Sequence, residues 1–225
     1  MSGHGAAADS LAEAGGVLRV ARTSERCSVL GPGTRFVVWV QGCPLACAGC
    51  VARETWDPGG GEAVEVDALA DRIAALPWVE GLTLSGGEPF TQAEALVRLA
   101  DRVRVRRPLS LMAFSGYTLQ WLRRRGSPGQ RALLERLDIL VDGPYRHDLH
   151  ADLRWRGSSN QRIHFLTPCH AHLAQADDRG VGMEVEVDDH GSVHWMGVPP
   201  VPGFREAFEQ ALRGQGVILT IPDPP

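Results

Sequence analysis

The chain has 225 residues, of which 44% are hydrophobic, so it can bury the core of one globular domain together with a small appendage. Its formal net charge of −4 gives no reason to expect a nucleic acid or an anionic membrane as a partner. All 23 basic residues are arginine, and the absence of lysine excludes Schiff-base chemistry on a lysine and a phosphate-binding P-loop lysine.

The five cysteines and the first residues bear on the cellular compartment. Five is an odd number for a disulfide framework, and three of them lie within eight residues, which favours a reducing compartment and predicts a cytoplasmic protein. Residues 1–16 have neither the cationic start nor the apolar segment of a signal peptide, so we expect a disordered lead. No apolar run is long enough to span a membrane.

Strands and helices are predicted to alternate through the first 166 residues. Apolar runs predict strands over residues 17–21, 36–41, 81–84, 109–114, 139–141 and 163–166. Helical periodicity predicts helices over residues 66–76, 91–105, 119–125 and 131–137, the third of them capped by Thr118. Most of these strands end in a Gly-rich polar loop, which is typical of a parallel α/β fold with its site at the carboxyl ends of the strands. A partial (β/α) barrel fits better than a Rossmann fold, because no G-x-G-x-x-G follows the first strand.

The character of the sequence changes after residue 167. Residues 183–187 and 192–196 alternate like the strands of a hairpin, and the Pro-rich segment 198–203 predicts a rigid linker. A helix over 204–213 and a strand over 217–221 are expected to follow. We therefore predict a barrel over residues 17–170 and a small appended α+β unit over residues 171–225.

Three cysteines follow directly after the buried strand that is predicted over residues 36–41. Cys43, Cys47 and Cys50 have the spacing C-x3-C-x2-C, and a fully protein-ligated [4Fe–4S] cluster would need four cysteines. Three thiolates would therefore leave one iron open to a substrate or cofactor. The alternative is a structural zinc ion, for which Cys27, Cys169, His164 or His170 could supply the fourth ligand.

A second motif, Ser85-Gly86-Gly87-Glu88-Pro89, ends the strand predicted over residues 81–84. Two glycines allow the backbone to approach a ligand closely, and Glu88 offers a carboxylate at the same place. The alternative reading of this motif is an ordinary turn between a strand and a helix.

Four longer motifs add to these two. They are Gly31-Pro32-Gly33-Thr34-Arg35, Phe114-Ser115-Gly116-Tyr117-Thr118, Val141-Asp142-Gly143-Pro144-Tyr145 and Trp155-Arg156-Gly157-Ser158-Ser159-Asn160-Gln161-Arg162. From about residue 17 to 166 the chain resembles the radical S-adenosylmethionine (radical SAM) superfamily, and within it the activating enzymes of anaerobic (class III) ribonucleotide reductases. It departs from that family at Val51-Ala52, where an aromatic residue and often Asn are usual, and in continuing for nearly sixty residues after the last strand of the barrel.

The resemblance implies an incomplete (β/α)6 barrel that binds a [4Fe–4S] cluster and SAM. By the same resemblance, Cys43, Cys47 and Cys50 ligate iron, and Gly86, Gly87 and Glu88 contact the amino group of SAM. Ser115, Ser158 and Asn160 are expected to contact its carboxylate or ribose.

The activity that the resemblance implies is the reductive cleavage of SAM to a 5′-deoxyadenosyl radical. The radical would then abstract hydrogen from a polypeptide, at a glycine Cα of a glycyl radical enzyme such as anaerobic ribonucleotide reductase. A flavodoxin- or ferredoxin-type protein is the expected electron donor. Two alternatives stay open: a radical SAM enzyme that modifies another peptide or a small molecule, and a binding module that zinc or a cluster merely stabilises.

Overall fold

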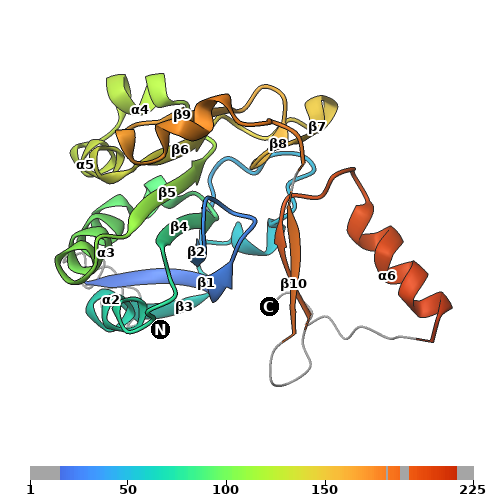
Figure 1. The fold of residues 1–225 in the computed structure, drawn as a ribbon, viewed down its shortest axis with the longest axis horizontal. Coiled ribbons are helices and arrows are strands. Elements are labelled where there is room, and N and C mark those ends of the chain that lie inside the picture. Colours follow the sequence, from blue (N-terminus) through green and yellow to red (C-terminus); the bar gives the residue numbers. More distant parts are fainter. Residues whose placement is uncertain (1–15, 181, 188–192, 217–225) are drawn as a thin grey trace, which may run out of the picture.

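The computed structural model describes residues 16–180, 182–187 and 193–216. A seven-stranded sheet runs through the molecule in the order β3-β1-β2-β4-β5-β6-β9 (Figure 1). Its strands are β1 (Val17–Cys27), β2 (Arg35–Val40), β3 (Glu62–Glu65), β4 (Gly81–Gly86), β5 (Ser110–Ser115), β6 (Ile139–Asp142) and β9 (Arg162–Phe165).

The strand directions confirm a mixed α/β fold with parallel strands at its centre. Strands β2, β4, β5 and β6 are parallel to one another, whereas β1 is antiparallel to both β2 and β3. The last strand departs from the expected parallel pattern, because β9 is antiparallel to β6. A parallel return needs a crossover, usually a helix, but this connection contains only the short hairpin of β7 (His150–Leu153) and β8 (Arg156–Ser158) and a turn of 3-10 helix.

The helices lie mainly where helical periodicity predicts them. They are α2 (Val66–Ala74), α3 (Ala93–Arg106), α4 (Leu119–Arg125), α5 (Pro128–Arg136) and, after the last strand of the sheet, α6 (Phe204–Gly214). Short 3-10 segments are η1 (Arg53–Thr55), η2 (Pro89–Gln92), η3 (His147–Leu149) and η4 (Pro168–Gln175). Thr118 caps α4 as predicted, since its hydroxyl accepts a hydrogen bond from the backbone N–H of Trp121.

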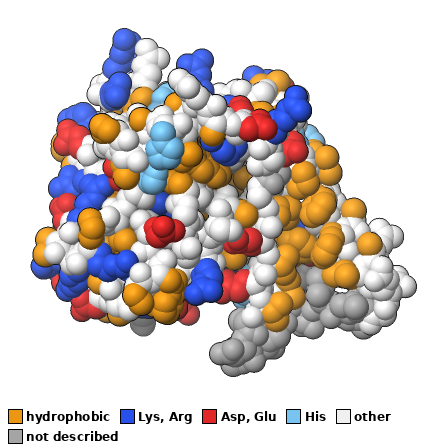
Figure 2. All heavy atoms as spheres, in the orientation of Figure 1, with side chains coloured by type: hydrophobic (Ala, Val, Ile, Leu, Met, Phe, Trp, Pro, Cys, Tyr) orange, Lys and Arg blue, Asp and Glu red, His pale blue; other side chains and the backbone are white. Residues whose placement is uncertain are grey.

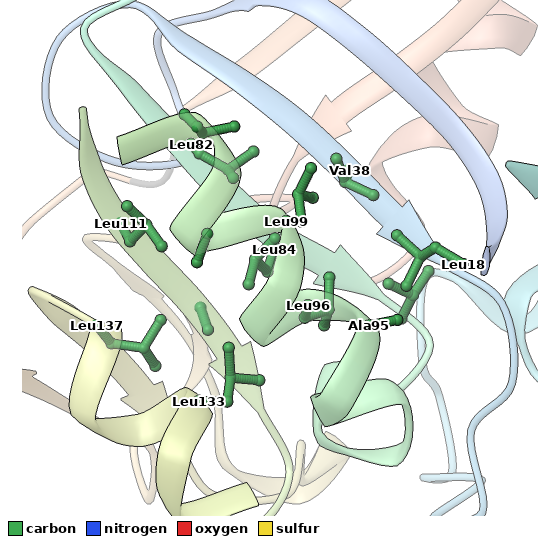
Figure 3. Packing of buried hydrophobic residues seen from close by; sticks show 14 of the residues in the cluster. Leu18, Val38, Leu82, Leu84, Ala95, Leu96, Leu99, Leu111, Leu133 and Leu137 are labelled. Carbon is green, nitrogen blue, oxygen red and sulfur yellow. The ribbon is translucent and has the colours of Figure 1, made fainter. Parts of the chain in front are cut away.

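The largest hydrophobic core lies between the sheet and helices α2, α3 and α5. Figure 3 shows Leu96 and Leu99 of α3 packed over Leu82, Leu84 and other side chains of the sheet. Every residue of β2 is buried, which agrees with the absence of polar alternation in its sequence.

The other face of the sheet is covered by segments that come late in the chain. Met196 packs beside Val37 and Trp39 of β2, whereas Trp155 packs against β5 and β6. Met196 belongs to β11 (Val193–Gly197), which pairs with β10 (Met183–Val187) in the antiparallel hairpin that the sequence predicts.

Three expectations lie wholly or almost wholly outside the described residues: the lead over residues 1–16, of which the structure describes only Gly16, the hairpin turn over residues 188–191 and the strand over residues 217–221. In the part of the chain that the structure describes, no helix is both long enough and apolar enough to cross a membrane.

Candidate cofactor site

The carboxyl ends of the four parallel strands meet at one edge of the sheet, and a cavity of about 200 Å³ lies there. Seven of the nine predicted site residues line it: Cys43, Cys47, Cys50, Gly86, Gly87, Glu88 and Ser115. They come from the ends of β2, β4 and β5, which parallel pairing brings side by side.

The cysteine loop is turned back on itself by two left-handed residues. Ala46 has φ = 42° and Gly49 has φ = 77°, and the N–H of Cys50 donates to the carbonyl of Cys47 at 3.1 Å across the turn that contains Gly49. The start of the loop is fixed where the N–H of Cys43 donates to the carbonyl of Trp56. All three cysteines are free and half-buried, so each thiol can reach a ligand in the cavity.

The surroundings of the cysteine loop disfavour the thiolate forms when no ligand is bound. Partial burial raises the pKa of the Cys43 and Cys47 thiols; Glu88 and Cys50 raise it further at Cys43, and Cys50 and Cys43 do so at Cys47. Among the described residues, no three His, Cys, Asp or Glu side chains are placed to bind one single metal ion. The thiolates that hold a [4Fe–4S] cluster each bind a different iron, so their sulfur atoms need not converge on one point. A set of ligands made only of thiolates suits an iron–sulfur cluster.

Gly86 and Gly87 let the end of β4 lie directly against the start of the cysteine loop. Gly86 has φ = 93°, and a Cβ added to Gly87 would overlap the carbonyl oxygen of Gly42. In the space that this leaves, the N–H of Glu88 donates to the same carbonyl at 2.8 Å. The two glycines therefore join the two predicted motifs through backbone contacts.

Glu88 is a buried carboxyl held by three donors. It accepts hydrogen bonds from the Ser115 hydroxyl at 2.9 Å and from the backbone N–H groups of Gly116 and Phe90 at 2.8 and 3.1 Å. Burial raises the pKa of Glu88 to about 7, although these hydrogen bonds act in the opposite direction. Glu88 forms no ion pair among the described residues, so a cationic ligand in the cavity would stabilise its ionised form.

The other two predicted residues do not line this cavity. Ser158 is fully buried, and its hydroxyl accepts a hydrogen bond from the N–H of Arg146 at 3.2 Å. Asn160 donates through its amide to the carbonyl of Pro144 at 2.8 Å and lines a neighbouring cavity of about 550 Å³ between α4 and β9.

Several residues that sequence reasoning did not assign to the site also line it. Tyr145 and Gln161 lie within motifs that the sequence already singles out, so their positions could have been suspected. The hydroxyl of Tyr145 lies 3.0 Å from Nδ1 of His150, another lining residue. Residues 197–199, which follow β11, also line it, and no signal in the sequence distinguishes them from a linker.

Comparison with known proteins shows the class of protein to which this chain belongs. Residues 29–164 match a family model described as a 4Fe-4S single cluster domain, which agrees with a three-cysteine loop in a cofactor cavity. The anaerobic ribonucleoside-triphosphate reductase-activating protein of Vibrio cholerae is 37% identical over 147 residues, which are 62% of this chain and 92% of that protein. The protein of the same description from Enterobacteria phage T4 is 32% identical over 140 residues, or 60% of this chain and 86% of that protein.

The chain therefore belongs to the family of anaerobic ribonucleoside-triphosphate reductase-activating proteins. Among solved structures, QueE from Escherichia coli is similar over 45% of this chain and 54% of its own, with a TM-score of 0.36 and 18% identity. That likeness is too distant to carry a conclusion.

Proposed function

We propose that this chain is a radical SAM activase that removes a hydrogen atom from a glycine Cα of an anaerobic ribonucleoside-triphosphate reductase. The observation that carries the proposal is the meeting of the cysteine loop and the Gly86-Gly87-Glu88 motif in one cavity, in a chain of the activase family. Cys43, Cys47 and Cys50 would hold three irons of a [4Fe–4S] cluster and leave the fourth to SAM.

The bound cofactors carry the radical chemistry. When bound, the cluster would pass one electron from a flavodoxin- or ferredoxin-type donor to SAM, and the reductive cleavage of SAM would supply methionine and the 5′-deoxyadenosyl radical that takes up the hydrogen atom to become 5′-deoxyadenosine. The protein binds, orients and shields the reacting groups.

Glu88 is the residue that we assign to the amino group of SAM. Its carboxylate is fixed by Ser115 and Gly116 on the next strand end, so the side chain is oriented before the ligand arrives. The apolar lining includes Trp39 and Trp155, which exclude water from the reaction. A SAM contact through Ser158 or Asn160 stays a prediction, because neither side chain lines the cavity in this structure.

We also propose that the sheet over residues 17–170 is the incomplete (β/α)6 barrel and that residues 171–225 are a separate appended unit. Two observations support this division. The helices α2, α3 and α5 cover one face only, and the family model ends at residue 164. Such a barrel without the appended unit is open on one side, and an opening beside that unit suits a macromolecular substrate that inserts a thin segment.

The test is to reconstitute the enzyme anaerobically and to incubate it with reductant, SAM and the anaerobic reductase of the same genome. Electron paramagnetic resonance should show a glycyl doublet that changes when the glycine carries deuterium at Cα, and the deuterium should appear in 5′-deoxyadenosine. If deuterium is transferred only from small molecules or from side chains of a peptide, the activase assignment fails, and a different radical SAM substrate takes its place.

A further inference from the structure

A segment of the appended unit forms part of the cofactor cavity. Gly197, Val198 and Pro199 line it together with the cysteine loop, although they lie more than thirty residues beyond the end of the family model. Figure 1 shows the β10–β11 hairpin and α6 on the side of the sheet away from α2 and α3. The appended unit therefore contributes to the cavity itself.

Two contacts fix the hairpin that leads into this segment. Met196 is buried beside Trp39 and Cys27 on the face of the sheet opposite the helices. The guanidinium of Arg22 donates to the carbonyl of Trp195 at 2.7 Å and lies 3.8 Å from the ring centroid of Trp39.

The far end of the segment is fixed by His150. Its Nε2 lies 3.3 Å from the carbonyl oxygen of Pro200, and its Nδ1 lies 3.0 Å from the hydroxyl of Tyr145. Because a carbonyl can only accept, Nε2 carries the proton and Nδ1 accepts from the tyrosine. Gly157 lets the segment lie close to β8, because a Cβ added to Gly157 would lie 3.4 Å from Cγ1 of Val198.

The residues that line the cavity from this segment, together with Val51 and Ala52 of the cysteine loop, are apolar or glycine. Residues 197–203 contain no charged side chain, and Val51, which is 58% exposed, lines the cavity from the cysteine loop. Figure 2 shows hydrophobic side chains gathered on the side of the molecule where the hairpin and α6 lie, and Phe208 is among those that are exposed.

We propose that residues 197–199 are the wall along which the partner polypeptide enters, and that Val198 selects an extended segment with small, uncharged side chains. The proposal rests on the proposed function, because it takes that polypeptide as the substrate. Moving a charged side chain against this apolar wall is costly, and a branched or bulky residue next to the glycine would collide with Val198. A glycine-containing loop meets neither obstacle.

The test compares Val198→Glu with a matched control, Val201→Glu. Val201 is 54% exposed in the same Pro-rich segment and does not line the cavity. The quantity to measure is the ratio of glycyl radical formed to SAM cleaved, with the reductase as substrate. We expect Val198→Glu to lower this ratio roughly tenfold or more, equivalent to about 1.4 kcal/mol, and Val201→Glu to leave it within twofold.

A second variant tests the role of His150 as a positioning residue. His150→Phe keeps an aromatic ring but removes the contact with Pro200, so the segment should loosen. We expect faster hydrogen exchange of the Val198 amide, which donates to the carbonyl of Gly182. We also expect a lower coupling ratio, by which we mean the ratio of glycyl radical formed to SAM cleaved, while the thermal unfolding midpoint stays unchanged.

The outcomes separate this inference from the proposed function. If the unmodified enzyme cleaves SAM but never produces a glycyl radical, the proposed function fails. If it does produce the radical and Val198→Glu has the same coupling ratio as Val201→Glu, the wall does not select the substrate. If Val198→Glu instead abolishes SAM cleavage as well, the segment contacts the cofactor, and the inference is wrong.

Discussion

The protonation state of Glu88 bears on the contact with SAM that we propose for it. Burial raises its pKa to about 7, so below that pH the unliganded side chain is protonated and cannot pair with the amino group of SAM. The unfolded chain releases this proton at a lower pH, so the contribution of Glu88 to stability falls as the pH rises from about 4.5 to about 7.

We predict that SAM affinity rises as the pH is raised from 5.5 to 7 and then levels off. The increase approaches tenfold per pH unit at the acid end, because binding the cation requires loss of the Glu88 proton. Glu88→Gln should bind SAM about ten- to a hundredfold more weakly at pH 8 and should lose most of this pH dependence. Anaerobic calorimetric titration at several pH values measures both effects; equal slopes for the two proteins would remove Glu88 from the SAM site.

The five cysteines occupy three different environments, which allows a second prediction. Cys43, Cys47 and Cys50 line the cavity, Cys27 is fully buried in the core beside Trp39, and Cys169 is exposed. Replacement by Ala at any of the first three positions should abolish the [4Fe–4S] signal after anaerobic reconstitution. Cys27→Ala and Cys169→Ala serve as controls and should keep it; if either loses iron as completely as Cys47→Ala, the ligand assignment is wrong.

At the scale of single residues, the sequence predicts what lies within compact motifs. Cysteine spacing and the Gly-Gly-Glu turn are local, so Cys47 and Glu88 reach the cavity as expected. Ser158 and Asn160 belong to a loop whose orientation depends on backbone hydrogen bonds to distant residues. Gln161 of that loop lines the cavity instead, and its Oε1 accepts a hydrogen bond from the N–H of Gly157.

Strand β2 carries a buried arginine whose role is structural. Arg35 is fully buried, yet all five of its side-chain N–H groups have acceptors, which belong to Thr83, Ser110, Leu82 and Pro32. Burial lowers its pKa to about 10, so the side chain remains charged at neutral pH. Arg35 thereby joins β2 to β4 and β5 at the end opposite the cofactor cavity.

We predict that Arg35→Lys lowers the free energy of unfolding by about 2 to 5 kcal/mol. Lysine has three donors instead of five, so buried carbonyls of neighbouring strands would lose their partners. Arg98→Lys is the matched control, since Arg98 pairs with Asp67 on the surface, where solvent screens the ion pair, and it should change stability far less than Arg35→Lys. Anaerobic denaturant unfolding measures both; similar losses for the two variants would contradict the assignment.

Among the elements, strand position was more predictable than strand direction. The apolar runs mark β2, β4, β5 and β6 because these strands are buried on both faces. The edge strand β3 has two glutamates in four residues and carries no such signal. The direction of β9 is set by the hairpin that precedes it, and no periodicity in its own four residues reports that direction.

On the scale of the whole molecule, the hairpin of β10 and β11 covers part of the sheet face that lies opposite α2, α3 and α5. The alternating pattern predicts its strands, but their docking depends on Met196 entering a space formed by β1, β2 and the loop between them, which no local pattern describes. We therefore expect Met196→Ala to weaken this docking by about 2 to 5 kcal/mol.

The check is limited proteolysis together with global unfolding. Met196→Ala should make residues 182–203 more susceptible to a protease before the sheet unfolds, because only the hairpin loses its anchor. Val185→Ala is the control, since Val185 is 48% exposed and should change susceptibility little. Cleavage that starts in the helices instead would show that the hairpin and the sheet unfold as one unit.

The position of the hairpin in the sequence has a consequence for biosynthesis. All seven strands of the sheet have been synthesised once β9 ends at Phe165, whereas Val198 follows about 30 residues later. At about 5–20 residues per second, a ribosome needs roughly 2 to 6 seconds to add them. During that interval the nascent chain already has its cysteine loop but lacks one wall of the cavity, so iron, sulfide and SAM have a wider entrance than in the finished protein.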